Sequence, residues 1–473
     1  MIRRVLDLAT VVCALLASSA ALAQTLGGTS APAGSLTLDQ ALQYALDHYP
    51  TIKAAAEQLN ASAAGVDVAR TAYLPRLDSL WQSNRGTANN VFGQVLPQSV
   101  IPALSGPVLA SASGDSVWSS AVGALFTWEP FDFGLRGATV TGAEATVTRA
   151  RATAALTQLD VESAVGIAFL AAVAAEQAVT AAQADVDRRE VLARSVHALV
   201  DNQLRPGADA SRIDAERAAA RTRLVQVQAA LDQARISLAR LLGVTAGTIT
   251  IDAAHLMDQS PPEIPSVTAV TVHPFIQVHA AAVDFARAQE TVLARTDLPR
   301  VYLLSSVFAR GSGASTTGPF DGGLTGLGLD RANWAVGFQV VMPNVFDFSS
   351  LHARQRAAAA TERAEAALYD ESVLTVSTQQ QTAAVLLRAA REVAANTPVQ
   401  LTAAQQSESQ ARARYDAGLA SLVEVADTQN LLAQAEFQDR LAHVDIWRAL
   451  LAQAAARGDL APFVALLHGS GGR

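Results

Sequence analysis

The sequence predicts a mainly α-helical chain with a small membrane β-barrel, built from two repeats of a strand, strand, long helix, helix unit. Three observations predict this class: an internal duplication, two helix-forming stretches longer than a globular core needs, and strands with one large apolar face. Four strands per chain are too few to close a barrel, since small barrels need about eight. Because lipid does not tolerate an open sheet edge, the chain is expected to oligomerise.

Composition favours a folded protein, and the N-terminal segment favours an exported one. Hydrophobic residues make up 50% of the 473 residues, and the net charge of −8 argues against nucleic-acid binding. A basic start, an apolar run and a small-residue cleavage site at 21–23 predict a signal peptide over residues 1–23. A buried N-terminal helix is the alternative. Cys13, the only cysteine, lies in this segment, so we expect a mature chain without disulfides or thiolate sites.

Two halves of the chain share short motifs in the same order. These are Tyr49-Pro50 with His273-Pro274, Leu74-Pro75-Arg76 with Leu298-Pro299-Arg300, Ala121-Val122-Gly123 with Ala335-Val336-Gly337, and Phe131-Asp132-Phe133 with Phe346-Asp347-Phe348. A conserved order of this kind predicts two structural repeats. We assign residues 24–242 to repeat one, 243–271 to a linker, 272–456 to repeat two and 457–473 to a flexible tail.

Each repeat is expected to follow one plan. A leading helix, begun in repeat one by a capping box of Thr37 and Gln40, ends at a Leu-Pro-Arg stop. Two strands and two long helices follow, with Pro398 expected to interrupt one of the helices. The predicted strands are 77–86, 117–128, 301–310 and 333–342, and the predicted long helices are 135–200, 208–242, 351–415 and 420–456.

The second strand of each repeat alternates between large apolar and small or polar residues. Such alternation is typical of a barrel wall with one face toward lipid and the other toward a wet lumen. An ordinary sandwich strand fits the alternation equally well, but four strands are few for a sandwich in a chain of this length. The residues predicted to face lipid are Trp118, Phe126, Trp128, Trp334 and Phe338.

The long helices need partners along their whole length, as in coiled coils. Apolar residues between Leu224 and Leu241 recur at alternating spacings of three and four, which predicts side-by-side helix packing.

With its duplicated plan, Leu-Pro-Arg stops, Phe-Asp-Phe strand ends and Gly-x-x-Ser helical turns, the chain resembles the TolC-type outer membrane efflux proteins from about residue 36 to 456. The resemblance implies a homotrimer in the outer membrane of a Gram-negative bacterium, with a shared twelve-stranded barrel over a helical tunnel. It also implies a tripartite efflux or type I secretion system, in which an inner-membrane pump and a periplasmic adaptor pass substrates to this channel. Residues 259–265 would lie in an equatorial belt.

The resemblance further implies a periplasmic tip at the turns between the long helices. Its aperture would carry Tyr415, whose hydroxyl is expected to latch neighbouring helices, and the acids Glu424, Asp427 and Asp214. The acid in repeat one lies one residue further from its glycine, so the equivalence of Asp214 and Glu424 stays open. The alternative is that these acids only favour helix N-termini. The turns expected to contact the adaptor contain Gly207, Ser211, Gly418, Leu419 and Ser421.

The sequence gives no indication of enzymatic function. Asp132-Phe133-Gly134 spells a kinase tripeptide, but the other kinase motifs are absent from the sequence. The eight histidines are scattered without metal-ligand spacing. We therefore predict no catalytic residues, no cofactor and no metal. The alternative to a channel is a periplasmic coiled-coil scaffold, which would explain the helices but not the paired apolar strands.

Overall fold

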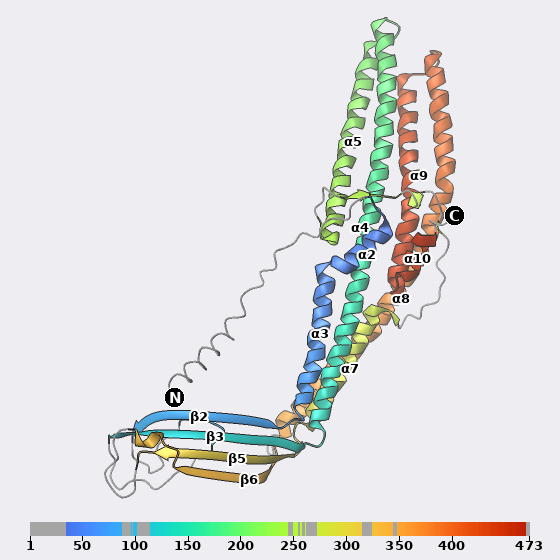
Figure 1. The fold of residues 1–473 in the computed structure, drawn as a ribbon. Helices are drawn as coiled ribbons and strands as arrows, with labels where there is room; N and C mark the ends of the chain where they lie inside the picture. Colours follow the sequence, from blue (N-terminus) through green and yellow to red (C-terminus); the bar gives the residue numbers. More distant parts are fainter. Residues whose placement is uncertain are drawn as a thin grey trace.

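The computed structural model describes residues 35–87, 96, 98–101, 114–244, 249–253, 256–257, 261, 272–314, 324–343 and 348–469. They form an elongated molecule with a β-sheet at one end and long helices running away from it (Figure 1). The predicted signal peptide lies outside the described residues, as do residues 346–347 of the second Phe-Asp-Phe motif and all of 259–265 except Pro261.

The sheet contains four antiparallel strands in the order β2-β3-β5-β6. They are β2 (Arg76–Thr87), β3 (Ser116–Phe131), β5 (Arg300–Ser312) and β6 (Arg331–Val341). Within the described part of the chain β2 and β6 are edge strands, so one protomer leaves the sheet open. Unpaired backbone groups at such edges require a partner strand in a membrane.

The strand register separates the side chains into two chemically different faces, because residues opposite one another share a face. The first face carries most of the large exposed apolar side chains, namely Leu77, Trp81, Trp118, Phe126, Trp128, Leu303, Val307, Trp334, Val336, Phe338 and Val340. Ser79, Ser83, Arg85, Ser120 and Ser305 share this face. The second face carries the polar or small residues Asp78, Gln82, Asn84, Ser119, Gly123, Thr127, Ser306, Arg310, Asn333 and Gln339. It also carries Tyr302, Leu304 and an apolar cluster of Leu80, Ala121, Leu125 and Phe308, which packs with Val100 and Ile101. Trp334 and Phe338 are 76% and 78% exposed in the single protomer.

Two shorter helices, α3 (Pro50–Thr71) and α7 (Pro274–Arg295), run between the sheet and the centre of the molecule, where α2 (Leu38–His48) lies (Figure 1). Thr37 and Gln40 form the predicted capping box at the start of α2. Pro50 divides the leading segment of repeat one into two helices, because proline is accepted in the first turn of a helix but not in its interior. Pro274 occupies the same position in α7.

Two helical hairpins form the shaft of the molecule. The first pairs α4 (Leu135–Asp201) with α5 (Gly207–Leu242), and the second pairs α8 (Phe348–Asp416) with α9 (Leu422–Arg457). At 1.5 Å per residue, α4 and α8 are each roughly 100 Å long. The hairpins meet where α4 packs against α9. The predicted interruption of α8 is wrong: the helix continues through Pro398, whose ring lies on an exposed face where one lost backbone bond is tolerated.

One described helix, α4, is long and apolar enough by composition to cross a membrane, although half of its most apolar window is buried inside the protein. That stretch packs into the main core, which lies midway along the shaft and joins α2, α4, α5 and α9. A short parallel pair, β1 (Ser35–Leu36) and β4 (Thr250–Ile251), flanks the same core.

The C-terminal segment differs from the predicted flexible tail, since Ala461–Gly469 forms helix α10. Phe463 is fully buried with its ring edge-on to Trp447, at 6.2 Å between ring centroids. Burial of a large aromatic side chain stabilises this segment against the core.

Candidate functional site: the distal turns of the helical hairpins

The α4–α5 and α8–α9 turns lie farthest from the sheet (Figure 1). The two turns have the same backbone structure. In each turn one residue has a positive φ, +61° at Gln203 and +75° at Gly418, and a leucine follows it. The amide hydrogen bonds also match: Gln203 to Val200 at 2.9 Å and Leu204 to Leu199 at 2.8 Å, against Gly418 to Tyr415 at 2.9 Å and Leu419 to Arg414 at 2.8 Å. Both turns are therefore Schellman-type helix ends.

This match settles which acids are equivalent. Pro206 and Ser421 are the N-caps of α5 and α9, so Glu424 corresponds to Asp209. Asp214 lies further along α5, within 3.1 Å of His197 Nε2 and Arg217 Nη2. Alignment of the two turns on their glycines pairs the wrong acids, because Gly207 begins α5, whereas the counterpart of Gly418 is Gln203.

Tyr415 connects the two hairpins. It is 1% exposed, and the Arg205 guanidinium lies 4.5 Å from the centre of its ring. Arg205 Nη2 also donates a hydrogen bond to the Tyr415 carbonyl at 3.1 Å. The phenol hydroxyl is buried and has no hydrogen-bond partner among the residues that the structure describes, and burial raises the pKa of Tyr415. In the single protomer, the ring and the carbonyl of Tyr415 make the contact with the other hairpin.

The two acids of the second turn have different environments. Glu424 Oε1 lies 2.9 Å from Arg414 Nη1, and the Glu424 amide donates to the capping Ser421 hydroxyl at 3.4 Å. Asp427 is exposed, and no ion pair to it is found in the part of the chain that the structure describes. Of the two, Asp427 is therefore the one whose charge is not offset by a neighbouring arginine.

Two exposed leucines stand at the apex of the turns. Leu204 is 69% exposed and Leu419 is 72% exposed. Gly418, Leu419 and Ser421 belong to one turn, while Gly207 and Ser211 lie in the first turns of α5. Sequence analysis missed Leu204, which an alignment on the helix ends rather than on the glycines would have found.

A second polar site joins the sheet to the shaft. The Asp132 carboxylate accepts hydrogen bonds from the Gly134 amide at 3.0 Å, and from the Arg136 amide and Nε at 2.6 and 2.9 Å. Burial opposes ionisation, but these hydrogen bonds prevail and lower the pKa of Asp132. The Arg136 guanidinium lies over the Tyr73 ring. The Phe-Asp-Phe motif, identified in the sequence as a repeat marker and a strand end, therefore supplies the carboxylate that hydrogen-bonds the start of α4.

Within the described ranges, no group of three or more His, Cys, Asp or Glu side chains is placed to hold a metal ion.

An open sheet with one apolar face, continued by a helical shaft of roughly 100 Å, defines a subunit of a barrel-and-tunnel membrane channel. The outer membrane efflux protein family matches residues 41–244 and 268–458, so the chain belongs to this family. The two matched segments correspond to the two repeats. Membership confirms the resemblance found in the sequence and assigns the chain to the outer membrane of Gram-negative bacteria.

Known relatives extend over nearly the whole chain. Protein CyaE of Bordetella pertussis is 26% identical over 435 residues, covering 90% of this chain and 84% of CyaE. The outer-membrane channel OprN superimposes with a TM-score of 0.71 at 22% identity, covering 89% of each chain. The open state of the MtrE outer membrane channel of Neisseria gonorrhoeae gives a TM-score of 0.69 at 19% identity, also covering 89% of each chain. These likenesses confirm the predicted fold class.

Proposed function

We propose that the chain is the outer-membrane channel subunit of a tripartite efflux or type I secretion system. Three copies would close a twelve-stranded barrel by joining β6 of one protomer to β2 of the next, since both edges are open within the described part of a single chain. The apolar sheet face would then meet lipid, with Trp118, Phe126, Trp128, Trp334 and Phe338 among its contacts, and the polar face would line the lumen.

The observation that carries this proposal is the pair of matched distal turns. Each presents a leucine about 70% exposed at the tip of a long hairpin. Apolar side chains that gather into one exposed patch mark a protein–protein contact, and the trimer would gather these leucines at one end of the molecule. In a trimer, Leu204 and Leu419 would give six near-equivalent apolar contacts in a ring. A periplasmic adaptor with sixfold or threefold symmetry would fit that ring, and an inner-membrane pump would supply the substrate.

The same end of the molecule would form the aperture. Tyr415, Glu424 and Asp427 lie within the last turns of α8 and the first turns of α9. Under threefold symmetry they would surround a narrow opening, where unpaired carboxylates attract cations. Asp209, rather than Asp214, is the acid of repeat one at the level of Glu424.

The test is the pair of changes Leu204→Asp and Leu419→Asp in the full-length protein. We expect a stable trimer that remains in outer membranes after carbonate washing, conducts ions, and fails to form site-specific photo-cross-links from the turns to an adaptor in the native host. Asn202→Asp and Ala417→Asp place the same charge in the same turns and retain the leucines, so they should preserve the cross-links. Equal cross-linking in the two pairs would refute docking through the leucines, and removal of the protein by carbonate would favour the periplasmic scaffold.

A further inference from the structure

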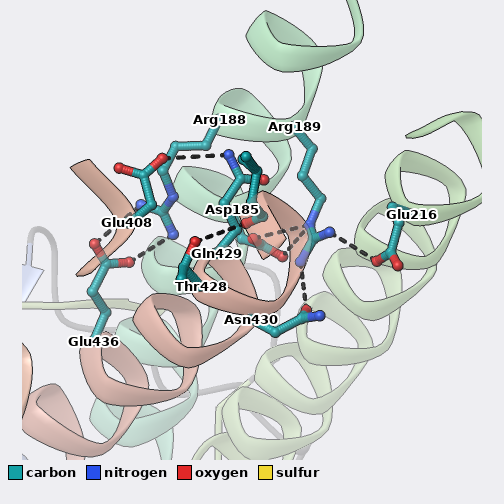
Figure 2. Close-up of polar contacts among 10 residues, drawn as sticks. Asp185, Arg188, Arg189, Glu216, Glu408, Thr428, Gln429, Asn430 and Glu436 are labelled. Carbon is teal, nitrogen blue, oxygen red and sulfur yellow. Dashed lines mark hydrogen bonds and ion pairs between the residues drawn. The ribbon is translucent and has the colours of Figure 1, made fainter. Parts of the chain in front are cut away.

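A layer of charged and polar side chains, with Asp185, Arg189 and Gln429 buried at its centre, crosses the shaft between its two apolar clusters (Figure 2). It draws residues from all four long helices. Its members, here called the polar layer, are Asp185, Arg188 and Arg189 of α4, Glu216 of α5, Glu408 of α8, and Gln429, Asn430 and Glu436 of α9.

Arg189 is the centre of the polar layer. It is 2% exposed even in a single protomer. Its Nε lies 3.1 Å from both Asp185 carboxylate oxygens, its Nη1 lies 2.9 Å from Glu216 Oε2, and its Nη2 lies 2.7 Å from Asn430 Oδ1. One guanidinium therefore bonds α4 to α5 and to α9. Removal of any one partner would leave part of this buried charge unpaired and would strongly destabilise the folded protein.

Arg188 makes the second connection between the hairpins. Its Nη1 and Nη2 donate to the two Glu436 oxygens at 3.0 and 2.8 Å, in the parallel geometry that gives an arginine–carboxylate pair both strength and direction. Nearer the centre of the molecule, Arg440 Nη1 donates to Gln177 Oε1 at 3.0 Å. Polar bonds thus hold α4 and α9 in one axial register along this part of the shaft.

Beyond the polar layer the contact between the hairpins changes character. Roughly 18 Å of α4 remains between Arg189 and the end of the helix, at about 1.5 Å per residue. Here the hairpins meet through an apolar cluster, and then through Arg205 on Tyr415 at the turn. The cluster contains Leu192, Ala193, Val196, Ile213, Ala411, Tyr415, Leu422 and Val425. Apolar contacts have no preferred direction, so they allow helices to slide where hydrogen-bonded ion pairs do not.

We propose that the polar layer is the fixed joint of each protomer, and that the two hairpins move relative to one another only beyond it when the aperture opens. The layer locks α4 to α9, and the terminal segments 190–212 and 410–428 form the movable unit. This inference rests on the proposed channel function, because it assumes an aperture at the distal turns.

The test is hydrogen exchange on the detergent-extracted full-length trimer. In the unmodified protein, amides at 192–200 and 422–428 should exchange faster than those at 174–184 and 437–445. Arg188→Glu and Glu436→Arg should each accelerate exchange at 174–184 and 437–445 by about tenfold, because like charges then face each other across the joint. The double change restores an opposite pair and should return exchange to the original rates.

Two matched variants separate the joint from general destabilisation. Arg205→Ala should accelerate exchange only in the terminal segments. Val173→Ala creates a cavity in the main core, and the terminal segments of this variant should still exchange faster than residues 174–184 and 437–445. The proposal is overturned if the double change fails to restore slow exchange. It is also overturned if the single changes accelerate exchange only beyond the polar layer. Loss of adaptor docking at the leucines would leave this exchange pattern unchanged, so failures of the two proposals are distinguishable.

Discussion

The contact between Arg205 and Tyr415 allows a quantitative prediction about closure of the aperture. Arg205→Ala removes a guanidinium 4.5 Å from the ring centre and a 3.1 Å hydrogen bond to the carbonyl. A cation–π contact contributes about 0.5–2 kcal/mol and a charge-assisted hydrogen bond about 1.5–3 kcal/mol. Arg205 is only partly buried, and solvent weakens both terms, so we expect a loss of roughly 2 kcal/mol per protomer. For each protomer, that loss corresponds to a shift of roughly thirtyfold in the equilibrium between the closed and open states, toward the open state.

The assay is the open probability of single trimers in planar lipid bilayers. Arg205→Ala should raise it, and Arg205→Lys, which retains the charge but not the planar donor geometry, should have an intermediate effect. Tyr415→Phe should behave like the unmodified channel, because within the described part of the chain the phenol hydroxyl makes no hydrogen bond. It retains the ring and the carbonyl that Arg205 contacts.

Two outcomes would refute this reasoning. One is an open probability for Arg205→Ala equal to that of the unmodified channel. The other is a larger increase for Tyr415→Phe than for Arg205→Ala, which would show that the hydroxyl latches the helices, as the sequence first suggested.

Three further predictions concern the sheet, the aperture and the central core. Phe338→Arg, on the apolar face, should cost about 2–4 kcal/mol and impair trimer assembly measured by light scattering, whereas Gln339→Arg should assemble normally; equal assembly would contradict the assignment of faces. Asp427→Asn should reduce cation selectivity, read as the reversal potential under a salt gradient, more than Glu424→Gln, whose partner Arg414 already offsets its charge; the reverse order would contradict the pairing. Burial lowers the pKa of His273 below its ordinary value of 6.5, so the unfolded chain gains a proton first and stability should fall as the pH drops below about 6.5. His273→Asn retains a helix cap without titrating and should lose that pH dependence in thermal unfolding.

The fold was predicted well because duplication, side-chain alternation and helix length can each be read directly from the order of residues in the sequence. Side-chain alternation gave the phase of β3 and β6, and the register of the sheet places Trp118 and Phe338 on one apolar face. The C-terminal helix was missed because its stability comes from Phe463 packing on Trp447, a contact between elements. Pro398 was misjudged because the cost of proline depends on which face of the helix it occupies.

The site was predicted less well because its chemistry arises between the repeats. The polar layer joins side chains far apart in the sequence, and each arginine alone resembles an ordinary solvated residue on a long helix. Asp185 and Arg189, four residues apart, could have indicated an ion pair on one helix face, but not that α5 and α9 would bury it. Helical periodicity identifies neighbours on the same helix and gives no information about the partner helix.

The distal turns show how a duplicated chain acquires an asymmetric contact. The turn register places Tyr415 opposite Val200 in the repeat comparison, and Arg205 opposite Ala420. The cation of repeat one therefore meets the ring of repeat two, whereas their counterparts, Val200 and Ala420, pack against the apolar cluster. Both repeats retain the backbone turn and its exposed leucine, which a sixfold ring of contacts requires. Among the described residues, the polar contacts between the two hairpins at the tip are those of Arg205 with Tyr415, and removal of Arg205 alone is sufficient to eliminate them.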